Sequence, residues 1–230
     1  MKSFQLKAFY EKYKHARPLL IYAVIYLVWF VWLEKNMTKD YTVIHVALDD
    51  KIPFCELFVI PYFLWFVYVS GVVLWFFFKD KDDYYRTCIF LFTGMTIFLL
   101  VSTFFPNGHH LRPKVMPRDN IFTALVAFLY DTDTATNLWP SIHVYNSLGA
   151  HFAVVKNKSL AKKKGICFGS LLLSTSIILS TMLIKQHSVF DVVTAFIMAA
   201  IMYGITYKFD IVTAYRERSH TRKKATPQVN

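Results

Sequence analysis

The sequence has few cysteines, few acidic residues and almost no charge inside its long apolar runs. Its three cysteines, Cys55, Cys88 and Cys167, are far apart and match no metal-ligand spacing, so we interpret them as apolar side chains that fill space. Several runs are long enough for a helix to cross a bilayer, which takes about 20 residues. These features exclude an ordinary soluble domain. The first run has no small-residue cleavage site and further runs follow it, which argues against a cleaved signal peptide.

The apolar runs predict an all-α, polytopic membrane protein that is a bundle of six transmembrane helices. We expect one domain over residues 1–215, followed by a basic, disordered cytoplasmic tail over 216–230. The predicted spans are 18–33, 53–78, 87–105, 140–155, 166–184 and 189–207. The apolar stretch 121–130 is too short to cross, so we expect a short interfacial or re-entrant helix before the fourth span.

The cationic residues are distributed unevenly among the predicted loops. The chain has 26 Lys and Arg against 15 Asp and Glu, for a formal charge of +11. In a soluble protein this balance would suggest a nucleic-acid partner, but most of these residues precede the first span, follow the last one or lie in the loops 79–86 and 156–164. The positive-inside rule then predicts cytoplasmic termini in what we expect is the plasma membrane. We expect anionic cytoplasmic lipids as partners and no nucleic acid.

Polar motifs mark the opposite, extracytoplasmic ends of the predicted spans. They contain Arg112, Ser141 with His143, and His187 with Asp191. His187 and Asp191 are four residues apart at the start of an apolar helix, so the carboxylate can accept the Nδ1 hydrogen of the imidazole and leave Nε2 basic. Ionisable pairs inside a span are costly and point to function. Pro140 and Ser141 are expected to open a helix with the proline in its first turn, and the free N–H groups there favour an anion such as phosphate.

Each motif taken singly also has a structural explanation. Arg112 can be a solvated or snorkelling loop residue, His143 a satisfied histidine at a helix end, and His187 with Asp191 a structural pair. Their common position at one face of the membrane favours a shared site. A metal cluster of the loop residues His109, His110, Asp131 and Asp133 is a further interpretation, less favoured than a solvated loop.

Three segments together carry a resemblance to a known family. Arg112-Pro113, Pro140-Ser141-x-His143 and Ser180-x6-His187-x3-Asp191 resemble, in order and spacing, the signature of the type-2 phosphatidic acid phosphatase superfamily over roughly residues 87–205. The usual lysine, glycine and arginine of that signature are replaced by Phe105, Ile142 and Thr181. The local sequences are nearer to the branch that contains inositol phosphorylceramide synthase.

The resemblance implies a fold and a mechanism. The family gathers its motifs at one membrane face of a six-helix bundle. His187 would attack phosphorus to form a phosphohistidine, Asp191 would orient it, and His143 would act as the acid and base. Arg112 and Ser141 would bind the phosphate oxygens, with no metal or other cofactor. Lys185 is our own addition: it either replaces the missing arginine in phosphate binding or only snorkels from the fifth span.

Two enzymatic functions follow from this site. With water as acceptor, the protein is a lipid phosphatase acting on phosphatidic acid, phosphatidylglycerol phosphate or a polyprenyl diphosphate. With an alcohol as acceptor, it is a lipid phosphotransferase that moves a phospho-head-group between lipids. A non-catalytic protein that binds lipid phosphates is the alternative of a different class, and a transporter is less favoured because the chain lacks inverted repeats.

Overall fold

The computed structural model describes residues 10–36, 40–210 and 212–213. The predicted domain boundary at residue 215 and the predicted tail 216–230 lie outside these residues. The structure is mostly helical, with two very short strands. Its elements are η1 (Lys14–Ala16), α2 (Arg17–Asn36), β1 (Thr42–Val43), η2 (Glu56–Phe58), α3 (Val59–Lys79), α4 (Lys81–Phe104), β2 (Asn107–Gly108), α5 (Ile121–Thr132), α6 (Ile142–Lys156), α7 (Lys164–Leu183), α8 (Val189–Tyr203) and the π-helix η3 (Gly204–Lys208).

Capping side chains fix where the helices begin. Asp80 accepts the backbone N–H groups of the first turn of α4, and Asn120 does the same for α5. Ser141 and Ser188 are the N-caps of α6 and α8. These side chains satisfy N–H groups that have no partner inside the helix. Because Ser141 is the cap, α6 begins after Pro140, whereas the sequence had suggested that the proline lies inside the first turn.

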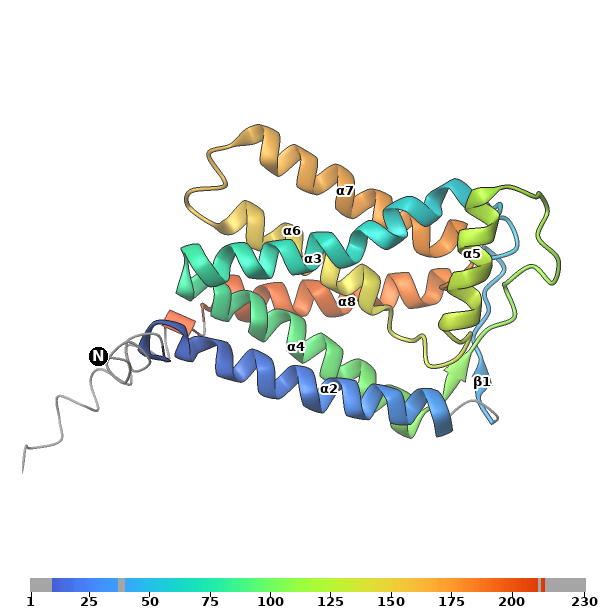
Figure 1. Ribbon diagram of the computed structural model, residues 1–230, viewed down its shortest axis with the longest axis horizontal. Helices are drawn as coiled ribbons and strands as arrows, with labels where there is room; N and C mark the ends of the chain where they lie inside the picture. The colour runs from blue at the N-terminus through green and yellow to red at the C-terminus, as the bar shows by residue number, and fades with distance from the viewer. Residues whose placement is uncertain (1–9, 37–39, 211, 214–230) are drawn as a thin grey trace, which may run out of the picture.

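Five helical segments are long and apolar enough to cross a membrane among the residues that the structure describes. They are Tyr10–Asn36, Glu56–Lys79, Lys81–Phe104, Lys164–Leu183 and Val189–Lys208. In Figure 1, α2, α3, α4, α7 and α8 run along the long axis of the molecule. The structure therefore has the form of a multi-pass membrane protein.

The predicted fourth span, 140–155, does not belong to this set. It forms α6, which has only 15 residues and carries His143, Asn146 and His151. α6 packs against α3, α4, α7 and α8, so that neighbouring helices rather than lipid cover most of it. A helix surrounded by protein needs neither an apolar surface nor the full thickness of the bilayer.

The helix α5 lies across one end of the bundle, near β1 (Figure 1). Its bounds agree with the short apolar helix that the sequence predicts at 121–130. The buried carboxylate of Glu56 connects it to η2, since Glu56 accepts two hydrogen bonds from Arg118, at 2.6 and 2.5 Å, and one from Asn120, the N-cap of α5. α5 and the first turn of α3 also share an apolar cluster. It includes Val59 and Tyr62 of α3 and Val126 of α5.

Two glycines allow α4 and α6 to approach closely. A Cβ atom at Gly94 would overlap the ring of Tyr145, and one at Gly149 would lie 2.6 Å from the ring of Phe90. The rings of Phe90 and Tyr145 stack at 4.7 Å, and the Tyr145 hydroxyl donates to the carbonyl of Phe90 at 2.8 Å. Because this hydrogen bond holds the Tyr145 ring in place, the ring has little room to move aside.

The substitution Gly94→Ala should destabilise the bundle by about 1–3 kcal/mol, because the added methyl group forces Tyr145 out of its packed position. Gly71→Ala is the matched control, since a Cβ at Gly71 meets no atom within 4 Å. Thermal unfolding of the purified proteins in detergent measures the difference. Equal stability of the two variants would show that the α4–α6 contact adapts to the extra volume.

Candidate active site

Three of the predicted site residues lie in contact where α6 and α8 begin. Nδ1 of His187 is 3.3 Å from Oδ2 of Asp191, and Nε2 of His187 is 3.4 Å from Nδ1 of His143. His187 and Asp191 are buried, and His143 is partly buried. With Asp191 accepting the Nδ1 hydrogen, Nε2 of His187 has a free lone pair that faces His143. Two histidines are therefore adjacent, although 44 residues separate them in the chain.

A hydrogen bond from the backbone helps to hold the Asp191 carboxylate in place. The Ser188 N–H donates to Oδ2 of Asp191 at 3.0 Å, so that this oxygen serves both the imidazole and the helix start. Oδ1 of Asp191 is buried without a hydrogen-bond partner among the described residues. Burial of the ring, together with the positive charge of Arg112, lowers the pKa of His187 to about 3, so the imidazole is neutral at pH 7.

Aromatic rings from α3 surround His143. The ring centroids of Tyr62 and Trp65 lie 4.6 and 4.4 Å from that of the imidazole. Tyr62 is buried, and the indole N–H of Trp65 has no hydrogen-bond partner among the described residues. These two residues were not predicted to belong to the site, because in an aromatic-rich span their only signal is a spacing of three residues.

Ser141 joins the two helix starts. It is fully buried, its Oγ lies 3.4 Å from the N–H of Val144, and its own N–H points to the carbonyl of Asp191 at 3.5 Å. The first turn of α6, whose N–H groups favour an anion, thus lies against the residue that orients His187.

The guanidinium of Arg112 is largely occupied by the backbone that follows α5. Nη1 donates to the carbonyls of Tyr130 and Asp133 at 3.2 and 2.8 Å, and Nη2 donates to Thr134 O at 2.9 Å and to the side-chain oxygen of Gln186. The guanidinium also lies over the Tyr130 ring, 4.4 Å from its centroid. Only Nε is buried without a partner among the described residues. Arg112 therefore fixes the end of α5 and keeps one N–H group unpaired.

His109 supports Gln186, the residue just before His187. Nδ1 of His109 accepts the N–H of Leu111 at 3.2 Å, so its Nε2 carries the hydrogen that it donates to the carbonyl of Gln186 at 2.9 Å. Burial lowers the pKa of His109 to about 4, and the ring is neutral at pH 7. A solvated loop or a metal cluster was the sequence-based interpretation of His109, and its buried contact with Gln186 shows that it does not belong to a solvated loop.

Lys185 lies at the turn between α7 and α8, with its ammonium directed at another loop. Nζ donates to the carbonyls of Asp49 and Ile52 at 2.8 and 2.6 Å. The residue has a φ of 55°, the left-handed conformation that commonly ends a helix. Thr181 is buried, and its hydroxyl donates to the carbonyl of Ile178.

Asp49 is a residue of this region that was not predicted from the sequence. Its buried carboxylate accepts from the hydroxyl of Ser188 at 2.6 Å and from the N–H of Val189 at 2.8 Å. An acidic side chain at the N-terminus of a helix is favourable, because it satisfies free N–H groups and the helix dipole. No sequence pattern indicates this role, since 139 residues separate Asp49 from Ser188.

No family model, curated protein or solved structure matches this chain. The case for a function therefore rests on the geometry around His143, His187 and Asp191, together with the sequence motifs that contain them.

The carboxyl group of Asp133 should make the free energy of unfolding depend on pH. Burial raises its pKa to about 6, despite the opposing effect of Arg112. Because the folded protein holds this proton more tightly than the unfolded chain, whose Asp pKa is about 3.9, the group favours folding most below pH 4. As the pH rises from about 4 to about 6, this contribution to the free energy of unfolding is lost, and it changes little at higher pH.

Thermal unfolding midpoints of the wild-type protein and Asp133→Asn, measured from pH 4 to 7.5, test this effect. We expect the wild-type midpoint to fall relative to that of the variant between pH 4 and 6, because the amide does not ionise. Two parallel curves over this range would contradict a raised pKa of Asp133.

Proposed function

We propose that the protein is an integral membrane lipid phosphatase that acts through a phosphohistidine. The observation that carries this proposal is the contact of His187 with both Asp191 and His143 at one end of a bundle of apolar helices. A buried carboxylate, a histidine with a free nitrogen and a second histidine are the groups that a two-step phosphoryl transfer needs. The substrates are a phosphate monoester or a diphosphate of a lipid, such as phosphatidic acid, phosphatidylglycerol phosphate or a polyprenyl diphosphate.

In the first step, Nε2 of His187 attacks phosphorus and the bond from phosphorus to the leaving oxygen breaks. His143, in its protonated form, gives its proton to that oxygen, while Asp191 stabilises the positive ring of His187. In the second step a water attacks phosphorus, His143 takes its proton, and phosphate leaves as His187 is regenerated. The protein supplies every group that these steps use, so the proposal requires no metal.

The phosphate oxygens have candidate ligands on three sides. We assign them to Nε of Arg112, to Ser141 with the first N–H groups of α6, and to the positive charge of Lys185. The free Nε of Arg112 supports its role. The two carbonyl contacts of Lys185 favour a structural role, so phosphate binding by Lys185 requires its ammonium to leave Asp49 or Ile52.

We further propose that α6 is a sixth span, enclosed by the other helices, and that α5 lies at the membrane interface. The basic loops then face the cytoplasm with both termini, and the histidines lie at the extracytoplasmic face of the plasma membrane. The alternation of Lys and Arg among the loops supports this orientation. The lipid phosphotransferase is the second candidate, favoured by the replacements at Ile142 and Thr181.

Phosphate release from the three lipid classes, with EDTA present, tests the proposal. We expect release by the wild-type protein and a loss of more than about 100-fold in His187→Ala. The control His110→Ala, which removes an exposed histidine of the loop between β2 and α5, should cause no loss. Release that EDTA abolishes would contradict the mechanism. If labelled phosphate passes only to an added alcohol, the phosphotransferase replaces the phosphatase, and binding without turnover would favour a non-catalytic protein.

The role of His143 as an acid predicts different losses of rate for two substrates with different leaving groups. His143→Ala should slow the hydrolysis of phosphatidic acid by about 10²–10⁴-fold, because an alkoxide leaves poorly without a proton. Formation of the phosphohistidine from a nitrophenyl phosphate should be affected much less, since nitrophenolate leaves unprotonated. Rapid-quench measurement of nitrophenol release in the first turnover compares the two substrates. An equal loss for both would remove His143 from the role of acid.

A further inference from the structure

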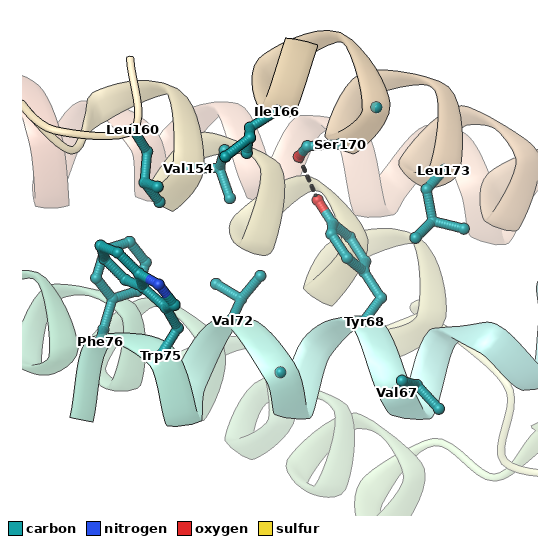
Figure 2. Close-up of a pocket in the computed structure, with 12 residues that line it drawn as sticks. Val67, Tyr68, Val72, Trp75, Phe76, Val154, Leu160, Ile166, Ser170 and Leu173 are labelled. Atoms are coloured by element: carbon teal, nitrogen blue, oxygen red, sulfur yellow. Dashed lines mark hydrogen bonds between the residues drawn. The ribbon is translucent and has the colours of Figure 1, made fainter. Parts of the chain in front are cut away.

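A cavity of about 420 Å³ lies between α3 and α7 (Figure 2), and its lining does not include His143, His187 or Asp191. Its walls are apolar side chains of α3 and α7, with Val154 of α6 and Leu160 also lining it. Two glycines, Gly71 and Gly169, face it from opposite helices, and a Cβ atom at either would meet no atom within 4 Å. The cavity is thus widened where α3 and α7 both lack a side chain.

The polar atoms at this cavity satisfy one another. The hydroxyl of Tyr68 lies 2.7 Å from Oγ of Ser170, as Figure 2 shows, and Nδ1 of His151 lies 3.0 Å from the same oxygen. These contacts link α3, α7 and α6. Because these groups are already paired, the cavity suits a hydrocarbon better than a polar ligand.

Along α3, the residues that line the cavity continue toward the candidate active site. Trp65, Tyr68, Val72 and Trp75 follow each other at intervals of three and four residues, which places them on one face of the helix. The last three line the cavity, and Trp65 packs against His143. One turn of α3 therefore separates the imidazole from the near end of the cavity.

The same continuity is present on α6. His143, Ser147, His151 and Val154 are spaced by four, four and three residues and share a face. At a rise of 1.5 Å per residue, His143 and Val154 are about 16 Å apart along the axis, close to half of the roughly 30 Å hydrocarbon core of a bilayer. This is the depth that one lipid chain occupies below its head group.

We propose that the cavity binds the distal part of a hydrocarbon chain of the lipid whose phosphate lies at His187 and His143. The inference rests on the proposed function and adds a site for the chain. In a bilayer, hydrocarbon is the abundant apolar occupant for an open cavity between two spans. The continuous faces of α3 and α6 connect it to the candidate active site, which distinguishes a substrate chain from a bulk lipid.

The test compares phosphatidic acids with dioctanoyl and dioleoyl chains. Gly71→Leu and Gly169→Leu fill the cavity from either wall, and they should lower kcat/KM for the dioleoyl lipid by about tenfold or more. Neither should change kcat/KM for the dioctanoyl lipid by more than about twofold, because its shorter chain does not extend past the two glycines. Gly204→Leu is the control: Gly204 also has open space around its Cβ position but does not line the cavity.

Other outcomes overturn the inference in distinguishable ways. Equal losses for both lipids would mean that the substitutions disturb the fold, and no loss for either would mean that the cavity holds a bulk lipid. Absence of phosphate release from both lipids by the wild-type protein would contradict the proposed function instead.

A photoreactive lipid tests chain binding in the wild-type protein, without substitution or turnover. A phosphatidic acid with a diazirine at its chain end should label residues 67–76 or 166–173, and one with the diazirine next to the glycerol should label the region of Trp65. Chain-end labelling confined to α2 or to the outer face of α8 would overturn the proposal. If cross-linking two copies of this chain prevents the labelling, the cavity is instead part of the contact between the two copies.

Discussion

The contact between the starts of α6 and α8 is the constraint on which the rest of the structure depends. His187, Asp191 and His143 meet only if two helices that begin at the same end of the bundle approach closely, with buried charge between them. Removing such groups from water is costly unless hydrogen bonds and neighbouring charges compensate. The close packing of α4 on α6 through Gly94 and Gly149 keeps α6 in the centre of the bundle, where the helices around it exclude lipid from the polar residues.

The loops at this end serve mainly to hold polar groups that the helices cannot satisfy alone. Arg112 caps the end of α5, Asp49 caps the start of α8, and Glu56 connects η2 to the segment before α5. Each joins segments that are distant in the sequence, so each restricts how the helix ends move relative to one another. A candidate site made of side chains on three helices gains its rigidity from these links, because apolar packing alone has little directional preference.

Much of the helical architecture could be predicted from hydropathy, and the motifs at the starts of α6 and α8 contained the residues that meet. Periodicity placed the ends of α7 and α8 within a few residues, and it located α5 as a short apolar helix. The six predicted spans became five long apolar helices and the shorter α6, since a hydropathy argument treats each helix as if lipid surrounded it. The partners of Arg112, Lys185 and Asp49 were not predictable, because backbone carbonyls and N–H groups have no sequence signature and their contacts span up to 140 residues. Tyr62 and Trp65 were not predicted as residues of the site, because α3 contains many other aromatic residues.

The ties between Asp49 and the turn at Lys185 and Ser188 also have a consequence for biosynthesis. A ribosome delivers the loop around Asp49 long before it delivers the last two helices, so the carboxylate lacks its partners in α8 while most of the chain is being inserted. Those partners arrive only with residues 185–189, which include one of the two site histidines. The contacts of the loop around Asp49 and the histidine pair are therefore completed in the same late event. A chain that stops early retains its first helices but neither the anchored loop nor the assembled histidines, so truncated products in the membrane lack the candidate site.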